Sequence, residues 1–382
     1  MSKFNKLTSK MYLFIIIFFI NFLFVNAQSE KHEHEDTDHH LKKENQEVKH
    51  DAHEHDHDAY EKCFVALHGV MLFQGMSFLE EEERFENQNG SPKEWNSSAS
   101  IPTFSVGMGY KFSKRTEFFA KAEFEYGGFG GHQHLHEHGD EANIGLEKSG
   151  AVTIERVYLT HKFSESFKLR MGHMPIPMGQ VYLAHEPTAY MASINAKADS
   201  KIIPGEWQET GISIFGKLSH QFDYQFMCVT GLDADYFEPY NFVSGGKQSR
   251  FEKIYFTSPA LVGRIDYNIN NLKLGLVGYW GSTDHNAQDQ QHEGRNINVA
   301  LLEFDTRYRT NKWHFLANII TGNATNTEKL DEPIAQSALS GSVELGFNLN
   351  HNESIFNNHE NALWLFGRID YSNPMMNMPP NR

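Results

Sequence analysis

Residues 115–127, RTEFFAKAEFEYG, decide the fold, because apolar and charged side chains alternate along them. One side of the extended chain carries Phe118, Ala120, Ala122, Phe124 and Tyr126, and the other carries Glu117, Lys121, Glu123 and Glu125. A repeat of two residues is typical of a β-strand with one apolar and one polar face. This segment therefore predicts a strand that separates an apolar from a watery environment.

The same alternation recurs along the chain and predicts an all-β, antiparallel protein. It is clear at 210–218, 221–230, 272–280 and 297–309. Extending the pattern gives about thirteen strands, at 60–77, 102–112, 115–127, 151–163, 166–173, 210–218, 221–230, 260–269, 272–281, 297–309, 312–320, 341–349 and 361–371.

The connections between these segments favour a transmembrane β-barrel over a soluble β-sandwich. Tight turns are predicted at 113–114, 164–165, 219–220, 270–271 and 310–311. Long polar connections alternate with them, at 78–101, 128–150, 174–209, 231–259, 282–296 and 321–340. Outer-membrane barrels sort their connections in this way, with short periplasmic turns and long extracellular loops. A sandwich could share the alternation within strands, but it has no reason to sort its loops by length.

The N-terminal residues predict secretion. Lys3, Lys6 and Lys10 precede an apolar run over 11–25, and small residues end at Ala27. This is the pattern of a signal peptide, and the run is shorter than a membrane-spanning helix. Residues 28–59 have almost no large apolar side chain and predict a disordered, acidic, His-rich periplasmic tail. The expected domains are therefore a signal peptide at 1–27, this tail at 28–59, and a barrel at 60–382.

Thirteen strands do not fit the even numbers of bacterial single-chain barrels. We therefore expect an even-stranded barrel whose C-terminal strands are lacking from this sequence, roughly three of them if the complete barrel has sixteen. A mean hydropathy of −0.53 together with 13% aromatic residues suits a sheet that faces lipid outside and water inside. The predicted location is the bacterial outer membrane, with lipid as a partner.

Composition argues against other classes of protein. The formal net charge of −15 disfavours nucleic-acid binding. Cys63 and Cys228 lie far apart in sequence, so disulfides do not organise the fold. No G-x-S-x-G or Walker motif is present, and no catalytic residue is predicted. An enzyme built from distant residues on a barrel stays an alternative.

Three stretches resemble the phosphate-selective porin family of types O and P and its Bacteroidetes relatives. They are RVYLTHKF at 156–163, LRMGHMPIPMG at 169–179 and PGEWQETG at 204–211. The resemblance implies a sixteen-stranded, trimeric channel for small solutes. Porins of that family select anions through a basic constriction, and the acidic, His-rich loops of this chain depart from it.

Histidines gather in two polar segments. Candidate metal ligands are His32, His34, His39, His40, His53, His55, His57, His132, His134, His136 and His138, interleaved with carboxylates. Imidazole and carboxylate suit Zn²⁺, Ni²⁺ or Cu²⁺. A flexible segment does not preorganise its ligands, so loose binding is expected. No cofactor is required, and the alternative is a solvated polar tail without metal.

The connection 174–209 is the best candidate to fold into the pore as a constriction, because it carries apolar residues between its charges. The residues expected to face the solute are His185, Glu186, Lys197, Lys201, Glu206 and Glu209. The alternative is an extracellular cap without a role in selection. Inside the strands, the inward charges are mixed and slightly basic.

The predicted function is passive passage of small ions and solutes, with His-rich segments binding divalent metals at the pore mouths. Two alternatives stay open. One is a metal-buffering protein whose barrel is only an anchor, and the other is a phosphate- or anion-selective porin.

Overall fold

A computed structural model describes residues 63–77, 95–125, 151–183, 189–192, 196, 198–248, 256–283, 286, 295–350 and 363–379. The chain divides into two units, Met1–His55 and Asp56–Arg382. All described residues belong to the second unit. The predicted signal peptide and the predicted tail at 28–59 lie outside the described residues.

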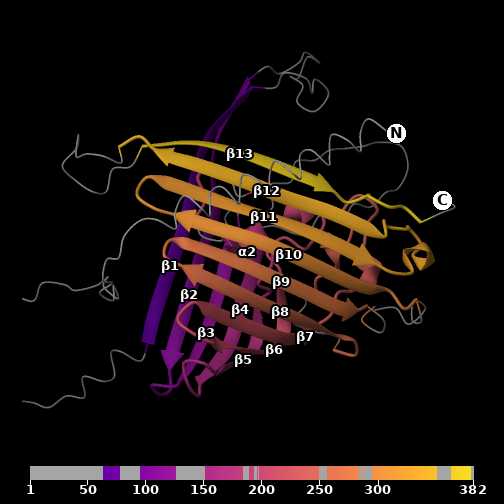
Figure 1. Cartoon of the computed structure of the whole chain (residues 1–382), viewed down its shortest axis with the longest axis horizontal. Coiled ribbons are helices and arrows are strands. Elements are labelled where there is room, and N and C mark those ends of the chain that lie inside the picture. Colours follow the sequence, from indigo (N-terminus) through magenta and orange to yellow (C-terminus); the bar gives the residue numbers. More distant parts are fainter. Residues whose placement is uncertain are drawn as a thin grey trace, which may run out of the picture. The chain divides into compact units, whose positions relative to one another are not determined.

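Thirteen strands form one antiparallel sheet. Neighbouring strands follow one another in sequence order, which the labels in Figure 1 allow the reader to trace. They are β1 (Cys63–Ser77), β2 (Trp95–Lys111), β3 (Thr116–Glu125), β4 (Ala151–Lys162), β5 (Lys168–Pro175), β6 (Gln208–Lys217), β7 (Phe222–Thr230), β8 (Pro259–Ile269), β9 (Leu272–Ser282), β10 (Asn298–Arg309), β11 (Trp313–Ala324), β12 (Ser337–Asn348) and β13 (Trp364–Asn373). The all-β, antiparallel prediction is confirmed. In the described part of the chain, no pairing joins β1 to β13, so the sheet is open there.

Three strand boundaries differ from the prediction by more than three residues. Strand β2 begins at Trp95 rather than at 102, because residues 95–100 pair with the end of β1. Strand β11 continues to Ala324 and β12 begins at Ser337, because 321–323 pair with 337–339. The five tight turns are confirmed. The connection between β12 and β13, on the side of the tight turns, is longer than these turns.

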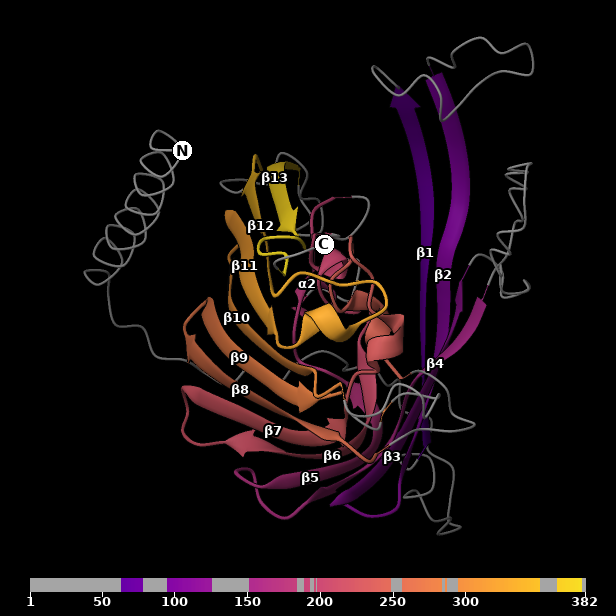
Figure 2. The same cartoon turned by 90° about the vertical axis from the view of Figure 1, so that its right-hand side faces the viewer.

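Short helical turns lie in the long connections. They are α2 (Gln180–Leu183), η3 (Asp199–Lys201), η4 (Ala234–Tyr236), η5 (Ser244–Gly246) and η7 (Thr327–Lys329). Within the second unit, α2 lies on the concave side of the curved sheet (Figure 2). Among the described residues, no helix is long and apolar enough to cross a membrane.

Neighbouring rows of the sheet show how the two faces differ. One row runs Ile265, Leu276, Phe304, Ile319 across β8 to β11, and all four side chains are exposed. The next row runs Asp266, Gly275, Asp305, Asn318, Ser342 across β8 to β12, and its four side chains are buried. Apolar residues therefore face outward and polar residues inward, which is the reverse of a soluble protein.

The inward position of the strand charges is confirmed for seven residues. They are Lys121, Glu123, Arg264, Asp266, Glu303, Asp305 and Glu344, all of them buried. The inward position of each residue follows from the alternation of side chains between the two faces of its own strand.

Candidate functional site

The connection between β5 and β6, residues 176–207, lies against the inner face of distant strands. Its backbone N–H at Gly179 donates to Oε2 of Glu303 on β10 at 2.8 Å. The N–H of Met191 donates to Oε1 of Glu344 on β12, also at 2.8 Å. We call residues 176–207 the inner loop. The structure thus places its described part inside the curved sheet rather than as a cap over the strand ends.

Asp199 holds the inner loop to the wall. Its Oδ2 accepts hydrogen bonds from the Gln180 backbone N–H at 2.7 Å and from Nδ2 of Asn318 at 2.8 Å. The Ser340 hydroxyl donates to Oδ1 at 2.9 Å. Burial raises the pKa of the Asp199 carboxyl, and these donors oppose that shift by stabilising the anion. Asp199 therefore joins two parts of the inner loop to β11 and β12.

Arg264 makes the second attachment. Its Nη1 donates to the Pro177 carbonyl at 3.1 Å and lies 2.8 Å from Oδ2 of Asp305. Its Nη2 donates to Oδ1 of Asp266 at 2.6 Å. Gly275 lies between the two carboxylates in the sheet, and a Cβ there would be 2.3 Å from Asp305 Oδ2 and 2.4 Å from Arg264 Nη2. The arginine crosses to Asp305 only because residue 275 has no side chain.

An apolar cluster fills the inside of the sheet toward the long connections. The inner loop contributes Ile176, Ile202 and Trp207, and the connection after β7 contributes Phe242. The wall contributes Met227, Val229, Val262, Val277, Tyr279 and Ile320. The inner face is thus apolar toward the long connections and charged toward the tight turns.

A cavity of about 550 Å³ lies beneath the inner loop. Four cations from four strands line its wall, namely Arg156, Arg170, Lys273 and Arg307. The inner loop lines the other side with Ile176, Met178, Tyr182, Leu183, Ile203 and Trp207. Among the residues that the structure describes, Asp199 and Glu206 add carboxylates to the lining. The cavity therefore has a cationic strand side, its wall, and a mostly apolar loop side that also carries Gln180 and Ser200, its roof. We call it the basic cavity.

The residues predicted for a constriction have different positions. Lys201 is exposed, and Glu206 is half-buried in the lining of the basic cavity. Glu209 is fully buried, and it accepts hydrogen bonds from Trp207 Nε1 at 3.0 Å and from the Thr230 hydroxyl. Glu209 is therefore placed within the framework rather than at an open surface. His185, Glu186 and Lys197 lie outside the described residues.

The eleven predicted metal-binding histidines also lie outside the described residues. They are His32, His34, His39, His40, His53, His55, His57, His132, His134, His136 and His138.

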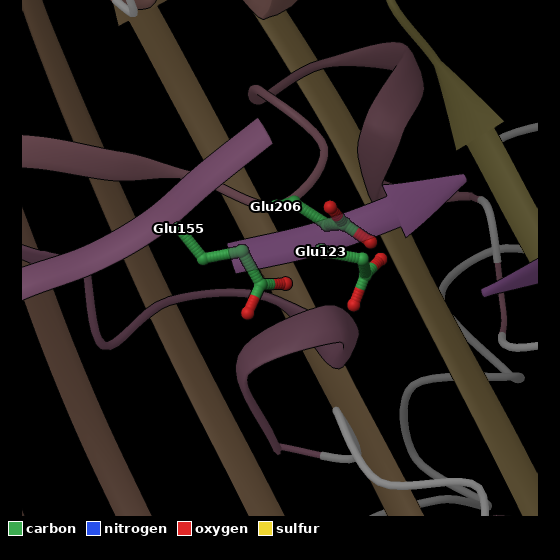
Figure 3. A group of neighbouring side chains, drawn as sticks. All are labelled: Glu123, Glu155 and Glu206. Atoms are coloured by element: carbon green, nitrogen blue, oxygen red, sulfur yellow. The ribbon is translucent and has the colours of Figure 1, made fainter. Parts of the chain in front are cut away.

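The structure adds a carboxylate cluster that the sequence did not indicate. In Figure 3, Glu123 on β3, Glu155 on β4 and Glu206 of the inner loop turn toward one another, and one oxygen of each lies within 4.8 Å of the others.

A β-bulge in β4 explains why the alternation along this strand did not predict an inward position for Glu155. Lys121 pairs with Arg156 and Ala122 with Ile154, so Glu155 is the extra residue. The bulge changes the phase of the strand and turns Glu155 inward as well as Arg156. Lys121 Nζ lies 2.8 Å from the Glu155 carboxylate and 3.9 Å from that of Glu123. Carboxylates suit hard cations such as Ca²⁺, but an ammonium already neutralises part of this cluster.

Comparisons by sequence give little about function. No family model matches the chain. A protein of Aquifex aeolicus (strain VF5), described as uncharacterized, is 29% identical over 198 residues. The match covers 51% of this chain and 40% of that relative, so the chain spans less than half of the relative's length.

Several solved outer-membrane proteins align with this chain at TM-scores below 0.5. The anion-selective porin of Comamonas acidovorans is 10% identical, with 75% of this chain and 74% of that chain covered at a TM-score of 0.43. The outer membrane channel DcaP of Acinetobacter baumannii is 12% identical, with 82% and 80% covered at a TM-score of 0.46. The Salmonella typhi OmpF complex with daunomycin is 11% identical, with 75% of each chain covered at a TM-score of 0.44. At these values no activity of those proteins is carried over to this chain.

Proposed function

We propose that this chain forms a porin-like channel in the bacterial outer membrane, through which small solutes pass passively. One observation carries the proposal: along consecutive antiparallel strands, apolar side chains are exposed on the outer face while charged side chains are buried on the inner face. Lipid is the solvent that suits such an outer face, and a polar inner face suits a watery passage.

The inner wall of the proposed channel favours anions. Four cations and two carboxylates line the basic cavity, and one of these carboxylates, Asp199, is engaged by three hydrogen-bond donors. A concave site lined by one sign of charge raises the local concentration of the opposite ion. This supports the anion-selective alternative over a neutral pore, although the chain as a whole is acidic. Phosphate selectivity and a homotrimer rest on the family resemblance alone and stay predictions.

Ion conductance tests the channel. We expect the full-length protein to produce conductance steps in a planar lipid bilayer, and its reversal potential in a KCl gradient to have the sign of anion preference. Arg156→Gln, Arg170→Gln and Arg307→Gln together should keep the steps but reduce the chloride-to-potassium permeability ratio several-fold, because the field in the cavity weakens. The matched control is Arg115→Gln, since Arg115 is exposed in the tight turn after β2. A silent protein would favour the anchor alternative, and an unchanged ratio would remove the anion preference.

We also propose that the two His-rich segments bind divalent transition metals, with Zn²⁺ as the probe. The support is compositional. Eight histidines between 32 and 57 and four between 132 and 138 account for twelve of the 22 in the chain. Their imidazoles alternate with carboxylates, a donor set that suits Zn²⁺.

Calorimetry tests the metal proposal. Deleting 30–58 and replacing His132, His134, His136 and His138 with serine should sharply lower the Zn²⁺ stoichiometry and leave the conductance unchanged. In the parent protein, Zn²⁺ binding should weaken from about pH 7 to about pH 5, because an imidazole with a reference pKa of about 6.5 is protonated at the lower pH and has no free lone pair. His220→Ser, in an exposed turn, is the control. Equal stoichiometry in the parent and the deleted protein would end the proposal.

A further inference from the structure

The basic cavity has two chemically different sides, and this division indicates a class of ligand. We propose that the cavity binds organic anions, meaning carboxylates that carry an apolar body. The proposal deepens the proposed channel function and rests on it, because it names the solute that the inner wall recognises. Its volume of about 550 Å³ lies in the ordinary range for small-molecule sites.

Aromatic rings hold Arg170 in a fixed orientation. Its guanidinium carbon lies 4.2 Å from the ring centroid of Tyr158 and 4.6 Å from that of Phe215. Its Nε donates to the Thr160 hydroxyl at 3.1 Å. The stacking rings leave the edge of the guanidinium plane for hydrogen bonding, and a carboxylate binds such an edge with two parallel hydrogen bonds. Arg170 is thus preorganised for a planar anion.

Two further arginines have unused donors. The Nη1 of Arg307 donates to the Leu183 carbonyl at 3.3 Å, which attaches the wall to the inner loop. The Nε atoms of Arg156 and Arg307 are buried and have no hydrogen-bond acceptor among the described residues. Within the same residues, no carboxylate lies within 4 Å of the guanidinium of Arg156, Arg170 or Arg307. These three positive charges can therefore act on a ligand.

Two neighbouring cations, Arg264 and Lys273, differ from these three arginines because carboxylates neutralise them. Arg264 is neutralised by Asp266 and Asp305, and Lys273 Nζ lies 3.0 Å from Asp266. The sheet thus compensates these two cations with carboxylates from a neighbouring inward-facing row. The three arginines of the basic cavity lack such compensation within the described residues.

The roof separates organic from inorganic anions. Ile176, Met178, Leu183, Ile203 and Trp207 of the inner loop line the same cavity as the arginines and give it apolar surface. Inorganic phosphate has no apolar surface to bury against these residues. Its contact with them would cost free energy, because the charged oxygens would lose water without gaining a partner. A carboxylate with an alkyl or aryl body can place its charge on the wall and its body against the roof.

A homologous series of probes tests both sides of the cavity on the unmodified full-length protein. Calorimetry in detergent, corrected with protein-free micelles, compares acetate, butyrate and hexanoate with hexanamide and inorganic phosphate. We expect affinity to rise along the acids by up to about fourfold for each buried methylene. Hexanamide should bind at least about tenfold more weakly than hexanoate, because it lacks the charge that an arginine pairs with. A flat series, an equal affinity for hexanamide, or phosphate binding tighter than hexanoate would each overturn the proposal.

Variants locate the binding. Arg170→Gln should weaken hexanoate binding at least about tenfold, whereas Arg115→Gln should leave it unchanged. Arg170→Lys keeps the charge but loses the planar fork, so it should bind hexanoate more weakly than the parent. Equal hexanoate affinity in the parent and in a folded Arg170→Gln protein would place the binding elsewhere. KCl conductance is recorded on the same preparations. A conducting protein that does not bind hexanoate contradicts only this inference, and a silent protein that binds hexanoate contradicts only the channel.

Discussion

Ile265→Lys combined with Leu276→Lys is expected to prevent assembly in a membrane. The two side chains are directly paired on neighbouring strands, lie midway along them, and are each 51% exposed on the outer face. A lysine on the lipid face at the bilayer midplane costs about 2–4 kcal/mol, so the pair should lower the free energy of unfolding by about 4–8 kcal/mol. In a water-soluble sheet the same exposed lysines would cost almost nothing.

The readouts are heat-modifiable migration on gels and guanidinium unfolding in lipid vesicles. The matched control adds the same two charges in the tight turns, as Gln221→Lys and Asn271→Lys, where both side chains are exposed. The control protein should assemble like the parent. A double lysine variant that also assembles like the parent would show that the outer face does not contact lipid, and the proposed membrane channel would be lost.

Arg264→Gln should lower the free energy of unfolding by about 3–5 kcal/mol. Arg264 is 3% exposed, and its guanidinium pairs with Asp266 and Asp305 while it donates to the inner loop at Pro177. Its removal leaves buried carboxylates without their cation, and such a loss costs about this much. Denaturant unfolding of the folded protein, followed by tryptophan fluorescence, measures the change.

Two further variants separate the charge from the packing at Arg264. Adding Asp266→Asn and Asp305→Asn to Arg264→Gln should recover part of the lost stability, because the uncompensated charges are gone. Arg115→Gln should change stability by less than about 0.5 kcal/mol, as expected for an exposed residue. If Arg264→Gln unfolds at the denaturant concentration of the parent, the contacts of Arg264 do not stabilise the inner loop.

The strands could be read from the sequence because their signal is local. A side chain in a strand alternates between two faces whatever the rest of the chain does. The segment at 115–127 therefore indicated β3 and placed Lys121 and Glu123 on the inner face. Local signals failed where the residues have weak strand propensity. Residues 95–101 and 321–324 are rich in small and polar side chains, and they form strands only because β1 and β12 supply hydrogen-bond partners.

The bulge and the inner loop depended on tertiary structure. Nothing in the sequence around Glu155 shows that β4 has one residue more than its partner, because a bulge is a property of the paired strands. The position of the inner loop was one of two expected from its sequence. The structure decided between them through hydrogen bonds such as that from Gly179 to Glu303, whose partners lie 124 residues apart.

The sequence by itself determined the order of the strands, the tight turns and, outside the bulge at Glu155, the face of the strand charges discussed above. Tertiary structure alone decided which of those charges meet. Arg156, Arg170, Lys273 and Arg307 come from four strands and reach one cavity because the curved sheet brings their inner faces together beneath the inner loop. Arg264 lies on the same inner face, but Asp266 and Asp305 neutralise it across Gly275. The physical reason is that alternation fixes only the face of a residue, whereas its electrostatic partners depend on register, curvature and the course of a loop.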